Sequence, residues 1–403
     1  MEVDRVSFAP RLLDVLTALS EAQFVSFDLE LSGVTTKSPA YKSKQSLQER
    51  YKDVKEAAER YQILQIGLTC AYEDKGKDKY VLRPYNFNLN PLLQEKLDIE
   101  RIFSFQSSAV EFLLSHGFQL QQPFLTGVPY LSRDEAVLAK RVAYERLDRT
   151  QFEDLHLKAE DVQSLEFVKR VRRDITQWKN TGKPYPDFLN IVPSDLIPDA
   201  GVSPELSRFE KRLVHQLVRA EYPELVTISR PQTIKIVRYD EARENELRRK
   251  RKQKVREQIN KQTGFRWIVE AMTGADLHQL DLRSFAFDPT TGEAKFVDLD
   301  DLSARFNRAK ILLKNRHPVL VGHNLFTDLI YFYKCFIGQL PETVEGFQQN
   351  VHGLFPVIID TKYMATHNCG DINPASSLEQ IEERLRTRVS PAIGSYSASQ
   401  TPV

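Results

Sequence analysis

Residues 24–34 read FVSFDLELSGV, an apolar and β-rich run that ends near a glycine. Such a run predicts a largely buried strand. Because successive side chains of a strand point to opposite faces, Asp28 and Glu30 project from the same face, with their Cα atoms about 7 Å apart. Two carboxylates in an apolar strand are costly to remove from water unless a cation accompanies them. The strand alone fits either a chance Asp-x-Glu pair or two ligands of a magnesium pair with ions about 4 Å apart.

The segments around this strand predict an α/β fold. Apolar strands are expected at 61–72 and 79–89, and the segments 318–336 and 355–365 each read as a strand that leads into a helix. Between these two groups the composition changes, and residues 161–240 read as a small inserted α/β module of roughly 80 residues. The expected parts are a main domain at 1–160 and 263–387, the inserted module at 161–240, a charged connecting helix at 241–262 and a disordered Ser- and Pro-rich tail at 388–403.

The overall charge is nearly balanced, with 56 Lys and Arg against 55 Asp and Glu in 403 residues. Hydrophobic residues make up 41% and charged residues 28%, which favours a soluble, folded chain over a disordered one. Residues 248–256 nevertheless concentrate basic side chains. A solvated connecting helix, a phosphate-contacting surface and a nuclear localisation signal all fit this run, so that nucleus and cytoplasm both stay open.

The cysteines and the N-terminal residues indicate the kind of cellular compartment in which the protein is expected. Cys70, Cys335 and Cys369 lie far apart, without the spacing of a disulfide scaffold or a cysteine zinc site, which favours a reducing compartment. The first residues, MEVDRVSFAP, lack the basic start and apolar run of a signal peptide. No apolar stretch approaches 18 residues, so no membrane span is expected.

A third carboxylate, Asp328, lies just beyond the expected strand at 318–322. It sits on the edge of the apolar helical stripe that contains Leu325 and Leu329. Functional sites of α/β proteins gather beyond the carboxyl ends of strands. Asp328 is therefore either the partner of a Lys or Arg or a metal ligand. His323, in the preceding turn, is either a substrate contact or a structural hydrogen-bonding residue.

Three motifs follow one another in a characteristic order: FDLELSG at 27–33, VGHNLFTDL at 321–329 and FPVIIDTKYMA at 355–365. This order resembles the DEDD nuclease pattern of the poly(A)-specific ribonuclease (deadenylase) family. The segments 61–68 and 106–131 are also similar to that family, so the resemblance covers most of residues 1–385.

The resemblance implies an RNase H-like mixed sheet flanked by helices, and 3′-to-5′ hydrolysis of RNA, preferably of poly(A) tails, with two Mg²⁺ or Mn²⁺ ions. By the same match Asp28, Glu30 and Asp328 are the metal ligands and catalytic carboxylates. One ion would generate a hydroxide nucleophile, and the other would stabilise the departing 3′ oxygen. The family forms homodimers through the nuclease domain, and a homodimer is implied here.

The resemblance also implies substrate contacts. Those near the active site are Leu31, Val34, His323 and Asn324. Leu31 stands where the family usually has an aromatic, which would weaken base stacking, typically worth about 1 to 3 kcal/mol per base.

The inserted segment resembles the family's nucleic-acid-binding module, which is named for its Arg-x-x-x-His signature. Here Lys211 stands at the signature spacing before His215, and Arg212 comes one place late. Lysine keeps the charge but lacks the planar fork that grips phosphate in two places. Lys211, Arg212 and His215 are the RNA contacts implied for this module.

The family's last motif, a His followed five places on by an Asp, is missing at its expected place. His367 and Asp371 are four apart and align with an ordinary loop, and Asp360 is expected to be structural. The fourth carboxylate completes metal binding in the family and the histidine is the general base. The sequence is then expected to be either a truncated form of a longer deadenylase or a silent RNA-binding relative. A nuclease that trims the 3′ ends of small RNAs is a further alternative.

Overall fold

The structure is a computed structural model that describes residues 1–35, 45–148, 155–181, 187–193, 205–367, 377–386 and 392–395. Contacts between residues divide the chain into two compact units, Met1–Ala143 with Val255–Val403, and Tyr144–Lys254. The expected inserted module, 161–240, lies inside the second and smaller unit.

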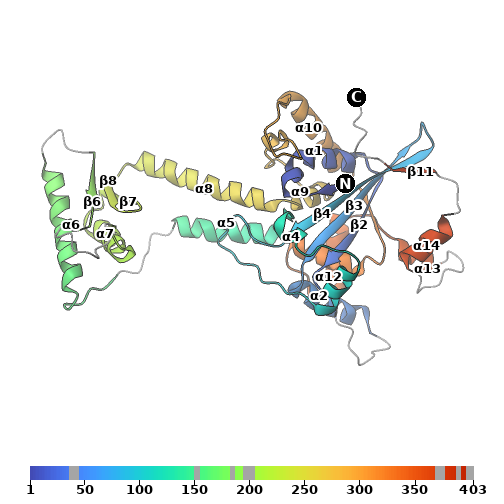
Figure 1. Ribbon diagram of the computed structural model, residues 1–403, viewed down its shortest axis with the longest axis horizontal. Coiled ribbons are helices and arrows are strands. Elements are labelled where there is room, and N and C mark those ends of the chain that lie inside the picture. Colours follow the sequence, from blue (N-terminus) through green and yellow to red (C-terminus); the bar gives the residue numbers. More distant parts are fainter. Residues whose placement is uncertain are drawn as a thin grey trace. The chain divides into compact units, whose positions relative to one another are not determined.

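The larger unit is built on one mixed sheet with the strand order β1-β4-β3-β2-β9-β10, and β5 and β11 pair with β4 (Figure 1). β2 runs antiparallel to β3 and parallel to β9, which runs parallel to β10. A mixed α/β architecture is therefore confirmed, with the strand that carries Asp28 and Glu30 inside the sheet. The strands are β1 (Glu2–Val3), β2 (Phe24–Leu31), β3 (Ile63–Asp74), β4 (Lys79–Asn90), β5 (Val128–Pro129), β9 (Val319–Gly322), β10 (Ile358–Asp360) and β11 (Ala392–Ser395).

Helices cover the apolar face of this sheet. Phe27 of β2 lies 5.6 Å from Phe332, and Phe87 of β4 lies 5.1 Å from Phe265, measured between ring centroids. Figure 1 shows α1, α9 and α10 gathered on one side, and α1 contacts both of the others. The helices are α1 (Arg5–Glu21), α2 (Leu47–Arg60), α3 (Ser107–Ser115), α4 (Gln122–Leu125), α5 (Arg133–Asp148, which ends in the smaller unit), α9 (Arg266–Met272), α10 (Leu299–Asn315), α11 (Phe326–Phe332), α12 (Val344–Leu354), α13 (Thr361–Thr366) and α14 (Leu378–Leu385), with a 3₁₀ turn η1 (Leu282–Phe285) and a π turn η2 (Tyr333–Ile337).

The smaller unit has a core of its own. Its antiparallel sheet has the order β6-β8-β7, with β6 (Phe188–Ile191), β7 (Leu225–Ser229) and β8 (Ile234–Arg238). Two helices, α6 (Val162–Asn180) and α7 (Arg208–Glu221), pack apolar side chains onto it. The N-terminus of α7 is fixed by a capping box between Ser207 and Glu210. The separate core explains why this segment forms its own compact unit.

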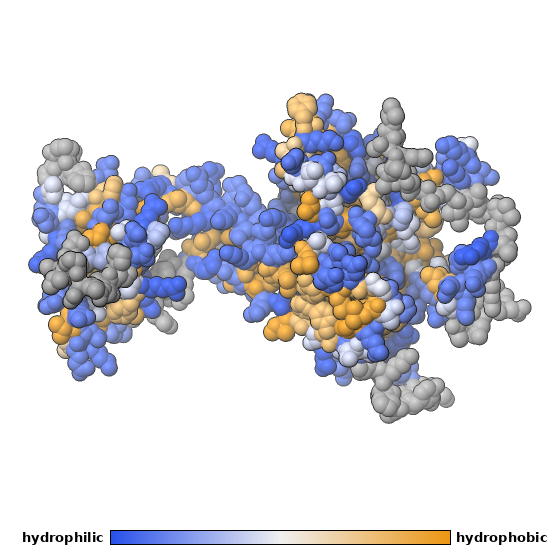
Figure 2. Space-filling model, viewed as in Figure 1, coloured by the Kyte–Doolittle hydropathy of each residue, from blue (hydrophilic) through white to orange (hydrophobic). Residues whose placement is uncertain are grey.

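α8 (Glu241–Thr263) is the charged helix expected from the sequence, and its surface is mostly hydrophilic in Figure 2. Several of its basic side chains pair with acids. Arg249 and Lys250 pair with Glu246, and Lys252 lies 2.6 Å from the carboxylate of Asp148. These pairs favour the solvated connecting helix among the three interpretations, because they neutralise part of the basic run. Nowhere in the described part of the chain is a helix both long enough and apolar enough to cross a membrane.

The C-terminal tail differs from expectation at one place. Residues 392–395 form β11, which pairs in parallel with Lys79–Leu82 of β4. The side of β4 away from β3 is open there, because β1 and β5 reach only its second half. An open sheet edge favours such pairing. The expectation of disorder is therefore wrong for these four residues, and the rest of 388–403 lies outside the described residues.

Candidate active site

The exposure of side chains along β2 alternates as the sequence predicts. Val25, Phe27 and Leu29 are buried against the helices, whereas Asp28 is exposed and Glu30 is half-buried. Opposite Asp28 in the register stands Gly67 of β3, and a Cβ at that position would meet nothing within 4 Å. The open face of the sheet therefore leaves room for a ligand beside Asp28.

Asp328 is placed by the turn between β9 and α11. Asn324 in this turn has a left-handed backbone, with φ of 59°. The carboxylate of Asp360, at the end of β10, accepts hydrogen bonds from the backbone N–H groups of Asn324 (3.0 Å) and Leu325 (2.9 Å), and it also caps α13. Burial would raise the pKa of Asp360, but these backbone donors lower it overall. Asp360 thus has the structural role that the sequence suggests, and it fixes the turn that precedes Asp328.

His323 belongs to the same turn, and one of its ring nitrogens is engaged. Its Nδ1 lies 3.0 Å from the hydroxyl of Thr361, which donates its hydrogen to the carbonyl of Gly322 at 3.0 Å. Because a hydroxyl has one hydrogen to donate, Nδ1 of His323 is the donor in its own bond. This bond fits the structural alternative for His323, and none of the described residues forms a hydrogen bond with its Nε2. The exposed Asn324 contributes its backbone N–H to the turn.

The three carboxylates act on one another electrostatically. Burial, together with the smaller effects of the charges of Asp28 and Glu30, raises the pKa of Asp328 to about 7. Partial burial also raises the pKa of Asp28, although part of its side chain is exposed, and the pKa of Glu30, to which the charge of Asp28 adds. For Asp28, a backbone hydrogen bond and the nearby His323 oppose this rise. Across the described ranges, no Lys or Arg forms an ion pair with any of the three carboxylates.

A divalent cation fits these residues by chemistry but not by their present positions. No group of three or more His, Cys, Asp or Glu side chains among the described residues is arranged to hold a metal ion. A preformed metal site at Asp28, Glu30 and Asp328 is therefore not observed. The donors themselves are suitable, because carboxylate oxygens are the preferred ligands of Mg²⁺. The charged forms of these acids, whose pKa values are raised by burial and, for Glu30 and Asp328, also by a neighbouring carboxylate, are stabilised when a cation joins them.

The two apolar residues that follow the acidic pair differ in exposure. Leu31 is 8% exposed and belongs to the main core, so little of it is left for a base to contact, contrary to expectation. Its side chain points to the helix-covered face of β2. Val34 is 41% exposed, and its backbone N–H is held by the side chain of Gln106 at 2.7 Å. Of the two, Val34 has the surface that a base contact requires.

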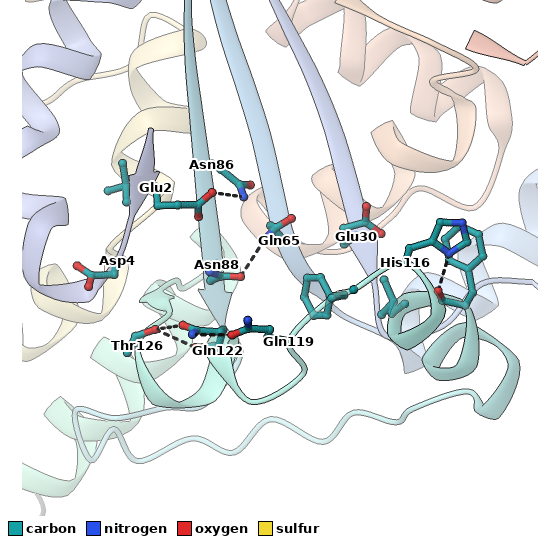
Figure 3. Close-up of a pocket in the computed structure, with 15 residues that line it drawn as sticks. Glu2, Asp4, Glu30, Gln65, Asn86, Asn88, His116, Gln119, Gln122 and Thr126 are labelled. Atoms are coloured by element: carbon teal, nitrogen blue, oxygen red, sulfur yellow. Dashed lines mark hydrogen bonds between the residues drawn. The ribbon is translucent and has the colours of Figure 1, made fainter. Parts of the chain in front are cut away.

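A pocket of about 600 Å³ opens on the polar face of the sheet beside Glu30 (Figure 3). Glu30 stands opposite Gln65, which stands opposite Asn88, so the three side chains form a row across β2, β3 and β4. His116 of the segment after α3 forms another part of the wall. Sequence reasoning missed Gln65 and Asn88, because a row across three strands depends on strand register.

The residues implied as RNA contacts of the smaller unit have mainly structural partners. The ammonium group of Lys211 donates to the backbone carbonyls of Arg230 (3.0 Å) and Pro231. His215 lies between the hydroxyls of Thr227 and Ser229. Burial lowers the pKa of the histidine, with a smaller effect of Arg219. Lys211 and His215 therefore join α7 to β7 and to the turn after it, and a contact of these two residues with RNA stays a prediction.

The structure describes two of the three remaining residues considered in the sequence, Arg212 and His367. Arg212 is exposed on α7. His367 is exposed and its ring stacks on that of Tyr363, with centroids 4.0 Å apart. Asp371 lies outside the described residues, so only His367 can be described of the pair that is most similar to the family's last motif.

Comparisons with known proteins give relatives over most of the chain. Over 400 residues it is 23% identical to a poly(A)-specific ribonuclease from Xenopus laevis, which covers 96% of this chain and 56% of the relative. It is 25% identical to a pre-piRNA 3′-exonuclease trimmer from Bombyx mori, which covers 91% of this chain and 58% of the relative. The chain thus spans little more than half the length of these two proteins.

A solved structure of Pop2p from S. pombe, in its Mg²⁺- and Mn²⁺-bound form, is 19% identical and covers 35% of this chain and 50% of its own. Its TM-score of 0.24 is too low to relate the two folds. The family comparison extends much further, because the CAF1 family ribonuclease pattern matches residues 3–402. A match over nearly the whole chain shows that this protein belongs to the CAF1 family of ribonucleases.

Proposed function

We propose that this chain is an exoribonuclease that depends on divalent metal ions and removes nucleotides from the 3′ ends of RNA, preferably from poly(A) tails. The observation that carries the proposal is the acidic group formed by Asp28 and Glu30, on the open side of β2, and Asp328, in the first turn of α11, none of which has a basic partner in the described residues. Membership of the CAF1 family supports RNA as the substrate. The names of the poly(A)-specific relatives support a poly(A) preference.

The three carboxylates are the residues that would hold Mg²⁺ or Mn²⁺. When bound, such ions activate a water molecule and stabilise the charge on the leaving 3′ oxygen. The fold of the chain positions these carboxylates. β2 holds Asp28 and Glu30 on one face of the sheet. The turn that Asp360 holds fixes the start of α11, which carries Asp328. The pocket beside Glu30 supplies space for nucleotides near the 3′ end.

A time course on 5′-labelled oligo(A) with Mg²⁺ tests this proposal. The expected result is a ladder that shortens from the 3′ end and disappears without Mg²⁺ and in the Asp28→Asn variant. Asp301→Asn is a matched control, because Asp301 is an exposed acid in the first turn of α10. If Asp28→Asn cleaves as fast as the control variant, the assignment of the acidic group is wrong.

A second candidate function is RNA binding without cleavage. It is favoured by the observation that the carboxylates do not form a ready metal-holding group in the described part of the chain. The same time course separates the two functions, because a silent relative would bind the labelled RNA and leave it intact.

Trimming of small-RNA 3′ ends is a third candidate, favoured by the similarity to the Bombyx mori trimmer. It shares the acidic group and differs in substrate. A mixed-sequence RNA of small-RNA length, in competition with oligo(A), distinguishes them, because a deadenylase would shorten oligo(A) first.

A further inference from the structure

The pocket beside Glu30 carries an unused pair of hydrogen-bonding groups. The side-chain amide of Gln65 donates to the side-chain carbonyl of Asn88 at 3.0 Å. Figure 3 shows Gln65 lying between Asn88 and Glu30. The Oε1 atom of Gln65 and the Nδ2 atom of Asn88 have no further hydrogen-bond partner in the residues that the structure covers. The pair therefore has at least one acceptor and one donor left, and both residues line the pocket.

This pairing does not depend on how each amide is oriented. If both amides are turned end over end, Asn88 donates to Gln65, and one donor and one acceptor again remain. The amide of Asn86, by contrast, is bound to the carboxylate of Glu2 at 2.8 Å, and Asp4 caps α1. Gln119 and Gln122, which also line the pocket, are bonded to each other, and Gln122 also accepts a hydrogen bond from Thr126. Gln65 and Asn88 lie next to Glu30 and have hydrogen-bonding groups left for a ligand.

The other walls of the pocket suit a flat, uncharged ring. Phe112 is 56% exposed, and its ring lies 4.1 Å from that of His116, measured between centroids. Among the described residues that line the pocket there is no Lys or Arg, which argues against a phosphate there. A volume of about 600 Å³ lies in the usual range for small-ligand sites and admits a purine. Aromatic faces with an amide edge are the usual means of holding and reading a nucleobase.

We propose that Gln65 and Asn88 form a base-reading edge that selects adenine at one of the last nucleotides of the RNA 3′ end. The acceptor of the pair takes the N6–H of adenine, and the donor binds an adjacent ring nitrogen, as Asn and Gln do in reading adenine in nucleic acids. Because Glu30 lines the same pocket, the base that is read lies close to the bond that the carboxylates serve. This inference rests on the proposed nuclease function for its RNA substrate.

The test measures binding without metal, so that it does not depend on cleavage. Fluorescence anisotropy in EDTA gives the Kd of the full chain for a 5′-labelled oligo(A), and for versions in which one of the last three adenosines is replaced by purine riboside, which lacks the N6 amino group. At one position the replacement is expected to weaken binding about 5- to 100-fold. Equal Kd values at all three positions would overturn the proposal without any variant.

Two variants assign the effect to the pair. Gln65→Met and Asn88→Leu remove the hydrogen-bonding groups without adding charge, and each is expected to bind the adenine and purine riboside RNAs alike. Asn307→Leu, a change at an exposed amide on α10, should keep the wild-type preference. Thermal melts establish which variants fold, and a single folded variant suffices. If a folded variant loses affinity equally for both RNAs, the pair contacts backbone or ribose and the proposal fails.

Cleavage in Mg²⁺ separates this proposal from the proposed function. If no RNA is cleaved but the adenine preference in binding follows Gln65 and Asn88, the nuclease function fails and base reading stands. If RNA is cleaved and the variants keep the adenine preference, the nuclease function stands and base reading fails.

Discussion

Asp328→Asn is expected to stabilise the metal-free protein at alkaline pH. Burial, with repulsion from Asp28 and Glu30, raises the pKa of Asp328 from 3.8 to about 7. The folded chain therefore binds this proton at pH values where the unfolded chain has released it. Between about pH 4 and pH 7 the folded state binds more protons, so its free energy of unfolding falls as the pH rises. Asparagine has nearly the same shape and carries no charge.

The size of the effect follows from the shift. At 1.36 kcal/mol per pKa unit, this shift corresponds to about 4 kcal/mol at full burial. Asp328 is partly exposed, and solvent screening reduces the expected gain to about 2 to 4 kcal/mol. The gain should be nearly complete at pH 8 and clearly smaller at pH 5, because the carboxyl is still largely protonated there in the folded protein.

Urea denaturation in EDTA at pH 5 and pH 8 measures both values. Of the two tryptophans, Trp178 lies in the smaller unit and Trp267 in the larger, so Trp178→Phe leaves Trp267 as the fluorescent reporter of the unit that holds Asp328. Mg²⁺ at pH 8 should stabilise the wild type more than Asp328→Asn. A variant that is less stable than the wild type at pH 8, or a difference that does not grow with pH, would refute the reasoning.

Three further substitutions test the structural roles of single residues in the two units. Asp360→Asn replaces a charged acceptor of several backbone N–H groups and should cost about 2 to 3 kcal/mol in urea denaturation; an unchanged midpoint would contradict its role in the turn. Gly264→Ala should abolish stable folding of the larger unit, seen as loss of the cooperative melt, because φ is +45° and a Cβ would lie 1.9 Å from the carbonyl oxygen of Pro129. Lys211→Met should lower the Tm of the smaller unit and leave the Kd for oligo(A) within about twofold; a larger loss of affinity would restore Lys211 as an RNA contact.

The features that were predictable from the sequence are those fixed by a few neighbouring residues. Asp28 and Glu30 share a face because side chains alternate along any strand, and the pattern around Asp328 predicts a strand, a turn and a helix. The polar row of Gln65 and Asn88 could not be predicted, because these two residues are 23 positions apart in the sequence and meet only through the register of β3 and β4. The bonds of Lys211 were equally hidden, since they go to carbonyls that carry no sequence signal. β11 pairs with residues more than 300 positions away.

The acidic group itself argues for a cation. A fold gains nothing in stability from three carboxylates whose pKa values are raised by burial and, for Glu30 and Asp328, also by neighbouring carboxylates, and asparagine at the same positions would avoid the repulsion. If Mg²⁺ stabilises the wild type and leaves Asp328→Asn unchanged, binding of the ion relieves the repulsion between Asp328 and its neighbouring carboxylates, and the instability of the free protein is the counterpart of its affinity for metal.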